Sequence, residues 1–172
     1  MLSPQQSAAL AAGELDFGLL LPPVPEAPGL EHIVVQRERF VAALPSRHRL
    51  ADGRGRLAMA ALAGEAFVMV PREIAPGLYD IVAGLAARAG FSLDVTQEAI
   101  QMQTIVSLVS SGLGAAIVPA CIANLGRRGV AYRELADHHP RLDLWLAWRR
   151  GPLGAAAREF LELAKRAKRA PA

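Results

Sequence analysis

The side chains with the clearest chemical potential lie where a helix is expected to begin, at Gln101, Gln103 and Thr104. They belong to the stretch EAIQMQTIVSLVSSGLGAAIVP, from Glu98 to Pro119, which predicts a strand end, a helix, a tight glycine turn and a buried strand. A helix start offers free backbone N–H groups, and polar side chains beside it add donors, so such a place can hold a small anion. The stretch therefore indicates small-molecule binding rather than catalysis.

A second place of this kind precedes the helix that we expect over Tyr79–Ala89. The turn Pro76–Gly77–Leu78 would expose backbone N–H groups at the helix start, where a carboxylate can bind. A plain connection between a strand and a helix explains the same residues equally well. Both interpretations stay open at this point.

The familiar catalytic and metal-binding patterns do not occur in the sequence. Gly112–Leu113–Gly114 lacks the third glycine of GxGxxG and follows a helix, which reverses the dinucleotide-binding order. The four histidines have neither an HExxH motif nor neighbouring cysteines, and the single cysteine, Cys121, has no histidine that the sequence places beside it. We therefore expect a protein that is not an enzyme, with no catalytic residue, no metal and no cofactor.

Length and composition limit the class of protein. A chain of 172 residues that is 52% hydrophobic suits one compact domain or two small lobes. No apolar run reaches the roughly 20 residues that cross a bilayer, and the start of the sequence lacks signal-peptide features, so we expect a cytoplasmic protein without membrane contact. The net charge is +3, and basic residues gather in 149–172. This favours a solvated helix end over a nucleic-acid contact, since no aromatic residues are interleaved.

Strands and helices alternate along the chain, which predicts an α/β fold with a mostly parallel sheet. The segment Leu30–Leu44 alternates at first and becomes apolar again at Phe40, so it predicts two strands, or one strand that runs between two lobes. Ser3 is expected to cap the first helix, and Phe160 is expected to face inward from the last. The expected helices cover 4–12, 57–63, 79–89, 102–111, 120–125 and 155–168, and the other strands cover 15–21, 66–70, 93–99, 115–118, 130–135 and 142–148.

Several short segments, taken in order, carry a resemblance to a known family. They are LAAGELDFGLL from Leu10, LPSRHRLA from Leu44, LVSSGLGAAIVP from Leu108, and a late strand with Leu144, Trp148 and Arg149. From about Leu10 to Phe160 the chain resembles the effector-binding, or substrate-binding, domain of LysR-type transcriptional regulators.

The resemblance implies a fold like that of type 2 periplasmic binding proteins, in which two α/β lobes are joined by crossing strands and the effector lies between them. Lobe I would comprise 1–40 plus 139–170, and lobe II would comprise 41–138. The implied effector is a small carboxylate or aromatic acid. The implied effector-binding residues are Pro76, Gly77, Leu78, Met102, Gln103 and Thr104, and the implied hinge residues are Arg39, Phe40, His139 and Pro140.

The family also has a helix-turn-helix, a linker helix and early lobe I strands that this sequence does not show. The resemblance therefore implies an N-terminally truncated regulator that reaches DNA only through a missing domain. The expected partners are a small-molecule effector and either further copies of the chain or an intact paralogue. The alternatives are a solute-binding protein of the same fold, an enzyme on a related two-lobe scaffold, and a module that pairs with a paralogue without binding DNA.

Overall fold

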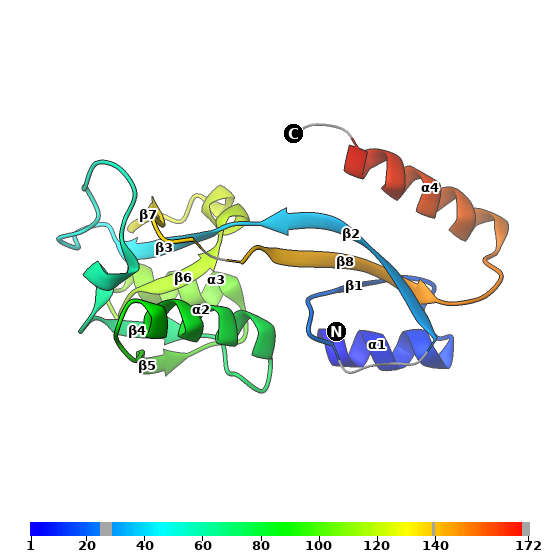
Figure 1. The fold of residues 1–172 in the computed structure, drawn as a ribbon, viewed down its shortest axis with the longest axis horizontal. Helices are drawn as coiled ribbons and strands as arrows, with labels where there is room; N and C mark the ends of the chain where they lie inside the picture. The colour runs from blue at the N-terminus through cyan, green and yellow to red at the C-terminus, as the bar shows by residue number, and fades with distance from the viewer. Residues whose placement is uncertain (25–28, 139, 170–172) are drawn as a thin grey trace. The chain divides into compact units, whose positions relative to one another are not determined.

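The computed structural model describes residues 1–24, 29–138 and 140–169, apart from the side chains of 168 and 169 (Figure 1). The chain divides into two compact units and passes between them twice. Unit 1 comprises Met1–Arg37 and Asp143–Ala172, and unit 2 comprises Glu38–Leu142. The predicted bounds of the two lobes, 1–40 plus 139–170 for lobe I and 41–138 for lobe II, stay a prediction.

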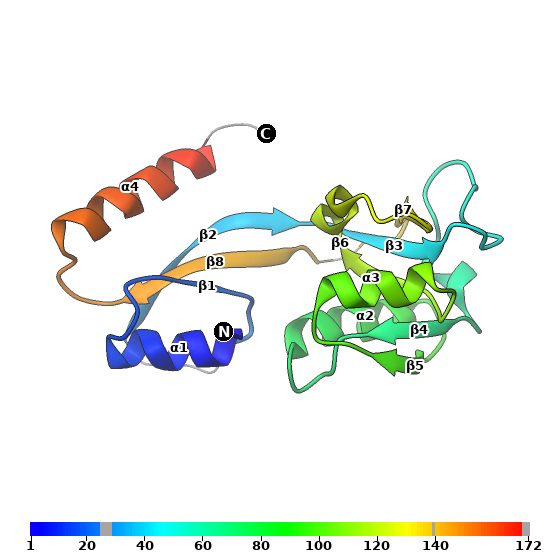
Figure 2. The ribbon, with the colours of Figure 1, turned by 180° about the vertical axis from the view of Figure 1, so that it is seen from behind.

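Unit 1 has a three-stranded sheet between two helices. The strand order is β1-β8-β2, formed by Gly18–Leu20, Leu142–Arg149 and Leu30–Glu38. Figures 1 and 2 show helix α1 (Ser3–Ala12) on one face of this sheet and helix α4 (Ala155–Arg169) on the other. Leu10 of α1 packs on Leu20, and Leu161 of α4 packs on Trp148, so each face has its own small apolar core.

Two side chains of these helices differ from the sequence predictions. Ser3 does not cap α1, because its hydroxyl accepts the N–H of Leu21 at 3.0 Å. On α4, Phe160 is 49% exposed although its ring contacts Phe17 at 4.9 Å, so the prediction that it faces inward is only partly right.

Unit 2 is built around β3 (Phe40–Pro45), whose residues are buried except for the last. β3 pairs with β6 (Ala116–Pro119) and with β7 (Val130–Glu134), while β4 (Ala66–Met69) pairs with β5 (Asp94–Glu98). A parallel bridge between Phe67 and Ala115 joins the two groups of strands. The uninterrupted apolar runs of β3 and β6 are typical of strands that are covered on both faces.

The strand pairing is mixed, and the prediction of a mostly parallel sheet is wrong. Within the described ranges, the β1–β8, β3–β6 and β3–β7 ladders are antiparallel, and the β4–β5 ladder is parallel. β3 follows β2 after one residue, Arg39, so the chain enters unit 2 directly as a strand. No helix precedes β3 there, whereas strands that pair in parallel need a long crossover connection, usually a helix. Alternation of helices and strands along the sequence does not reveal such an entry.

Two helices flank the β4–β5 pair, with α2 (Pro76–Arg88) on one face and α3 (Met102–Ser110) on the other (Figures 1 and 2). α2 begins at Pro76 rather than at Tyr79, because proline is well suited to the first helical position. The expected helices over 57–63 and 120–125 are short 3-10 turns, η1 (Met59–Leu62) and η2 (Ala120–Leu125). No described helix has the length and apolar content that a membrane crossing needs.

A glycine fixes the junction between β4 and β6. Gly114 has φ +153°, and a Cβ added there would lie 2.6 Å from the carbonyl oxygen of Ala66. The strands are this close because the N–H of Ala115 donates to the Ala66 oxygen at 2.8 Å, and the N–H of Val68 donates to the Ala115 oxygen at 2.8 Å. The glycine therefore permits a backbone approach that a side chain would block.

Candidate functional site

The starts of α2 and α3 lie at one edge of the unit 2 sheet. The parallel strands β4 and β5 end together, with the N–H of Ala99 donating to the oxygen of Met69 at 2.9 Å. α2 follows β4 and α3 follows β5, so both helices begin beyond the carboxyl ends of these strands. This edge is where open α/β sheets usually bind ligands.

An apolar cavity of about 10 Å³ lies between the two helix starts. Leu78 of α2 and Met102 of α3 both line it, so the structure brings together one apolar residue from each predicted segment. The other lining residues are Val68, Met69, Val70, Val82, Ile105 and Ile117. The cavity has room for about one water molecule, so an organic ligand would lie over it or widen it.

The start of α3 carries the polar groups of the site. The N–H of Thr104 donates to the carbonyl of Gln101 at 3.0 Å, and within the described chain no side chain caps the helix. The N–H groups of Met102 and Gln103 precede the first intrahelical bonds, and the side chains of Gln103 and Thr104 are exposed. The positive end of the helix dipole and these donors together suit an anion.

The start of α2 contributes fewer donors. Pro76 has no N–H, so the free backbone donors of its first turn are those of Gly77 and Leu78. Leu78 is buried, whereas Pro76 and Gly77 are half-buried. These residues form the first turn of the helix itself and not a loop before it, which corrects the predicted Pro76–Gly77–Leu78 turn.

The four predicted hinge residues occupy different surroundings. Arg39 separates β2 from β3, lines a pocket of about 360 Å³ and lies 3.7 Å from a Glu134 carboxylate oxygen. Phe40 is 1% exposed in the core of unit 2, Pro140 is exposed, and His139 lies outside the described residues. A hinge role for these residues stays a prediction.

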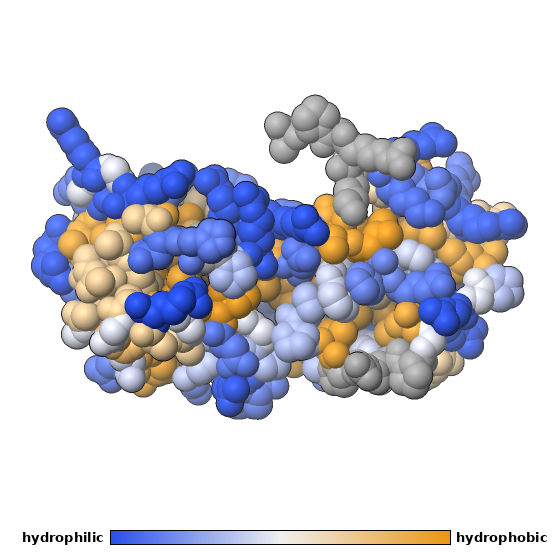
Figure 3. Space-filling model, in the orientation of Figure 1, coloured by the Kyte–Doolittle hydropathy of each residue, from blue (hydrophilic) through white to orange (hydrophobic). Residues whose placement is uncertain are grey.

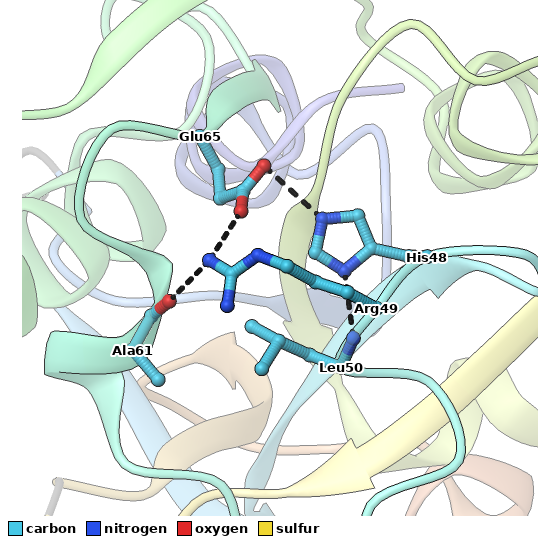
Figure 4. Close-up of polar contacts among 5 residues, drawn as sticks. All are labelled: His48, Arg49, Leu50, Ala61 and Glu65. Carbon is cyan, nitrogen blue, oxygen red and sulfur yellow. Dashed lines mark hydrogen bonds and ion pairs between the residues drawn. The ribbon is translucent and has the colours of Figure 1, made fainter.

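Figure 4 shows a polar cluster to which the sequence analysis gave no role. The Glu65 carboxylate lies 3.1 Å from Nε2 of His48 and accepts a 2.8 Å hydrogen bond from Arg49, which also donates to the carbonyl of Ala61 at 3.2 Å. Nδ1 of His48 accepts the N–H of Leu50 at 3.2 Å, so Nε2 carries the proton that faces Glu65. These contacts link the loop after β3, which carries His48 and Arg49, to η1 and to the residues between η1 and β4.

A histidine–carboxylate pair can activate a nucleophile, but the thiol of this chain is placed elsewhere. The backbone N–H of Cys121 donates to the Glu38 carboxylate at 3.2 Å. Burial raises the pKa of the Cys121 thiol, and the Glu38 charge raises it further. The protonated thiol is a poor nucleophile. In the part of the chain that the structure covers, no three His, Cys, Asp or Glu side chains gather as a metal site.

The Glu65 cluster predicts a specific loss of stability in acid. The hydrogen bond from His48, helped by the one from Arg49 and opposed by burial, holds the pKa of Glu65 below its ordinary value of 4.5. A carboxylate with a lowered folded pKa stabilises the fold above its unfolded pKa, and this stabilisation is lost as pH falls through the folded pKa. We expect Glu65→Gln to cost about 1 kcal/mol at pH 7. The cost should shrink below about pH 4.5.

Urea unfolding of both proteins between pH 3 and 7, followed by circular dichroism, checks this expectation. Glu73→Gln is the matched control, since it makes the same change at an exposed carboxylate outside the cluster. A Glu65→Gln cost that stays constant across this pH range would show that the charge of Glu65 contributes nothing.

Comparison with known proteins decides the family. A sequence profile described as the LysR substrate binding domain matches residues 1–169. The chain belongs to this family.

It is 40% identical over 165 residues to the HTH-type transcriptional regulator IlvR of Caulobacter vibrioides, a match that covers 94% of this chain and 54% of IlvR. The chain thus spans about half the length of the curated relatives it matches. The predicted family is confirmed, and the relatives that the chain matches are named as transcriptional regulators and not as enzymes, as expected.

Solved structures of the LysR family share the fold. The C-terminal domain of a probable LysR regulator from Rhodococcus sp. RHA1 aligns with a TM-score of 0.79 at 21% identity, over 96% of this chain and 81% of that one. The BenM effector-binding domain with its effector benzoate aligns with a TM-score of 0.80 at 21% identity, over 96% and 75%. The predicted fold class, an α/β effector-binding domain of this family, is confirmed.

Proposed function

We propose that residues 1–172 are the effector-sensing part of a LysR-family transcriptional regulator, and that a small carboxylate or aromatic acid binds over the starts of α2 and α3. The observation that carries this proposal is the convergence of two helix starts at the carboxyl ends of β4 and β5, over a cavity lined by Leu78 and Met102. Benzoate, the effector named for BenM, has the chemistry that suits such a place: an anionic end and an apolar ring.

Each part of the ligand has a counterpart in the site. The carboxylate would accept the N–H groups of Met102 and Gln103 and the hydroxyl of Thr104, where the dipole of α3 adds positive potential. The apolar part would pack on Leu78 and on the Met102 side chain. A ligand held this way gains from charge-assisted hydrogen bonds and from apolar burial together.

Regulation would follow from a shift between conformations of the chain, driven by a difference in effector affinity between them. Contact with DNA would come through a helix-turn-helix domain, as in the HTH-type relatives, and the regulator would act in the cytoplasm as a homo-oligomer or with a paralogue. Effector binding by this chain can then be measured in the absence of DNA.

Removing the Thr104 hydroxyl should weaken effector binding. Thr104→Val keeps the shape of the side chain and deletes one hydrogen bond to an anionic ligand, so we expect the dissociation constant to rise about tenfold or more. Isothermal titration calorimetry with benzoate and a panel of other small carboxylates measures the effect on whichever acid the unmodified chain binds.

Thr96→Val is the matched control, because it makes the same change in β5, away from the start of α3. It should leave the affinity unchanged. Equal affinities for the Thr104→Val variant and the unmodified chain would contradict the proposed role of Thr104.

A further inference from the structure

Unit 2 has a second pocket, which shares no lining residue with the cavity between the starts of α2 and α3. Its volume is about 360 Å³, and every residue that lines it belongs to unit 2. The lining comes from the start of β3, from the loop after β3, and from the end of β7 with the segment that follows it. A volume of this size is typical of small-molecule sites. The candidate effector site does not account for this pocket.

Three arginines from different segments line this pocket. Arg39 lies between β2 and β3, Arg56 lies in the loop after β3, and Arg141 directly precedes β8. All three side chains are exposed, so a dissolved ligand can reach them. Figure 3 shows strongly hydrophilic residues along the upper side of unit 2, in the region of β3 and β7. Guanidinium groups from three segments suit an anion that has several oxygens.

One carboxylate is shared between two of these arginines. Oε1 of Glu134 lies 3.7 Å from Nη1 of Arg39, and Oε2 lies 3.2 Å from Nε of Arg56. Among the described residues, no carboxylate forms an ion pair with Arg141. The glutamate therefore holds two guanidinium groups near each other, and the charge of the third is left for a ligand.

The other polar residues of the pocket suit an organic part that carries hydroxyl groups. Oδ2 of Asp137 accepts the N–H of Met59 at 2.6 Å, which leaves Oδ1 to accept a hydroxyl. His138 follows Asp137, is exposed and also lines the pocket, so it offers a second hydrogen-bonding group. The three guanidinium groups outnumber the two carboxylates, and the pocket keeps an excess of positive charge.

We propose that this pocket binds a small sugar phosphate, whose phosphate group lies among Arg39, Arg56 and Arg141. A phosphate monoester has three terminal oxygens and up to two negative charges, so it can accept charge-assisted hydrogen bonds from all three arginines. A carboxylate has two oxygens and one charge, and one guanidinium group already matches it. Glu134 has the same sign of charge as the ligand and competes with it for two of the arginines.

A phosphate held in this way would connect the two segments by which the chain passes between its units. The first passage lies between Arg37 and Glu38, next to Arg39, and the second lies between Leu142 and Asp143, next to Arg141. One ligand bound to Arg39 and Arg141 would therefore restrain both segments at once.

Titration of the full chain with ribose 5-phosphate tests this proposal, by calorimetry and through the backbone amide signals in NMR. We expect one saturable site with a dissociation constant of about 1 mM or below. The shifted amides should include Arg39, Val41, Asp137 and Arg141. Ribose, which lacks the phosphate, should not bind. Inorganic phosphate should bind about tenfold more weakly, because it lacks the hydroxyl contacts.

Three variants make the test specific. Arg141→Gln should weaken the binding of ribose 5-phosphate about tenfold or more, because it removes the guanidinium group without a carboxylate partner. Arg88→Gln deletes the same charge at the exposed end of α2 and should bind normally. Glu134→Gln should strengthen binding about threefold or more, because the competing negative charge is gone.

The proposal is overturned if ribose 5-phosphate gives no saturable signal, if Arg141→Gln binds it as well as the unmodified chain, or if Arg88→Gln loses the same affinity. Weaker binding by Glu134→Gln would contradict the competition. Equal affinities for inorganic phosphate and ribose 5-phosphate would overturn the assignment to a sugar phosphate. Shifts confined to Met102, Gln103 and Thr104 would place the ligand at the candidate effector site and overturn a second site.

Discussion

Replacing Gly114 by alanine is expected to destabilise unit 2 by about 3 kcal/mol or more. Gly114 has φ +153°, which L residues rarely adopt, and its added Cβ would lie 2.6 Å from the Ala66 oxygen. The atom in the way is backbone, so relief requires β4 and β6 to move apart. That movement would break the hydrogen bond between Ala115 and Ala66 at the junction of the two strands.

Urea unfolding monitored by far-UV circular dichroism measures this loss of stability. The Gly112→Ala variant separates the cost of backbone strain from the cost of the steric clash. Gly112 has φ +82° but no atom within 4 Å of its added Cβ, so its replacement carries backbone strain without the clash. We expect Gly112→Ala to cost about 1–2 kcal/mol, clearly less than Gly114→Ala. Equal costs would mean that the close approach of β4 to β6 does not constrain residue 114.

Changing Gln103 to glutamate is expected to have opposite effects on stability and on effector binding. A carboxylate in the first turn of α3 interacts favourably with the helix dipole, so the free energy of unfolding should rise by about 0.3–1 kcal/mol. The same charge would repel an anionic ligand held at this helix start. At a separation of about 5 Å and an effective dielectric constant of about 20, the repulsion is about 3.3 kcal/mol and weakens binding about two hundredfold.

Gln5→Glu is the matched control, since it makes the same substitution in the first turn of α1 in unit 1. Oε1 of Gln5 accepts the N–H of Leu2 at 3.0 Å, and glutamate can keep this bond. Thermal unfolding should show the same stability for the Gln5→Glu and Gln103→Glu variants. Titration calorimetry should show the same effector affinity for the Gln5→Glu variant and the unmodified chain. An effector site at the start of α3 is wrong if Gln103→Glu binds the ligand normally, or if Gln5→Glu loses binding to the same extent.

Much of the fold could be predicted because local signals were strong. The apolar run at Phe40 and the polar break before it left two alternatives open, and the structure has the first of them, with separate strands β2 and β3 on either side of Arg39. Helix α1 ends at Ala12, where the sequence predicted its end, and Gly13 follows in a left-handed conformation. Strand direction could not be predicted, because it depends on where the chain enters unit 2 and not on residue pattern. β1 is also shorter than its apolar run over 15–21, since only Gly18–Leu20 pairs with β8.

The sequence predicted the two helix starts of the candidate site separately but not that they lie together. Proline at 76 and the polar residues around Met102 mark two helix starts in the sequence, but their meeting at one cavity depends on the parallel pairing of β4 with β5. The Glu65 cluster joins residues 16 positions apart, and the Arg56 contact with Glu134 joins residues 78 apart. Neither spacing is a motif, so no sequence signal identifies these contacts in advance.

The most direct test of the central claim is a titration of the isotope-labelled chain with benzoate and other small carboxylates, followed through the backbone amide signals by NMR. The account predicts that at least one acid shifts the amides of Gly77, Leu78, Met102, Gln103 and Thr104 together, with one dissociation constant. Saturable shifts confined to other parts of the chain, or no saturable shift with any acid of the panel, would contradict an effector site at the starts of α2 and α3.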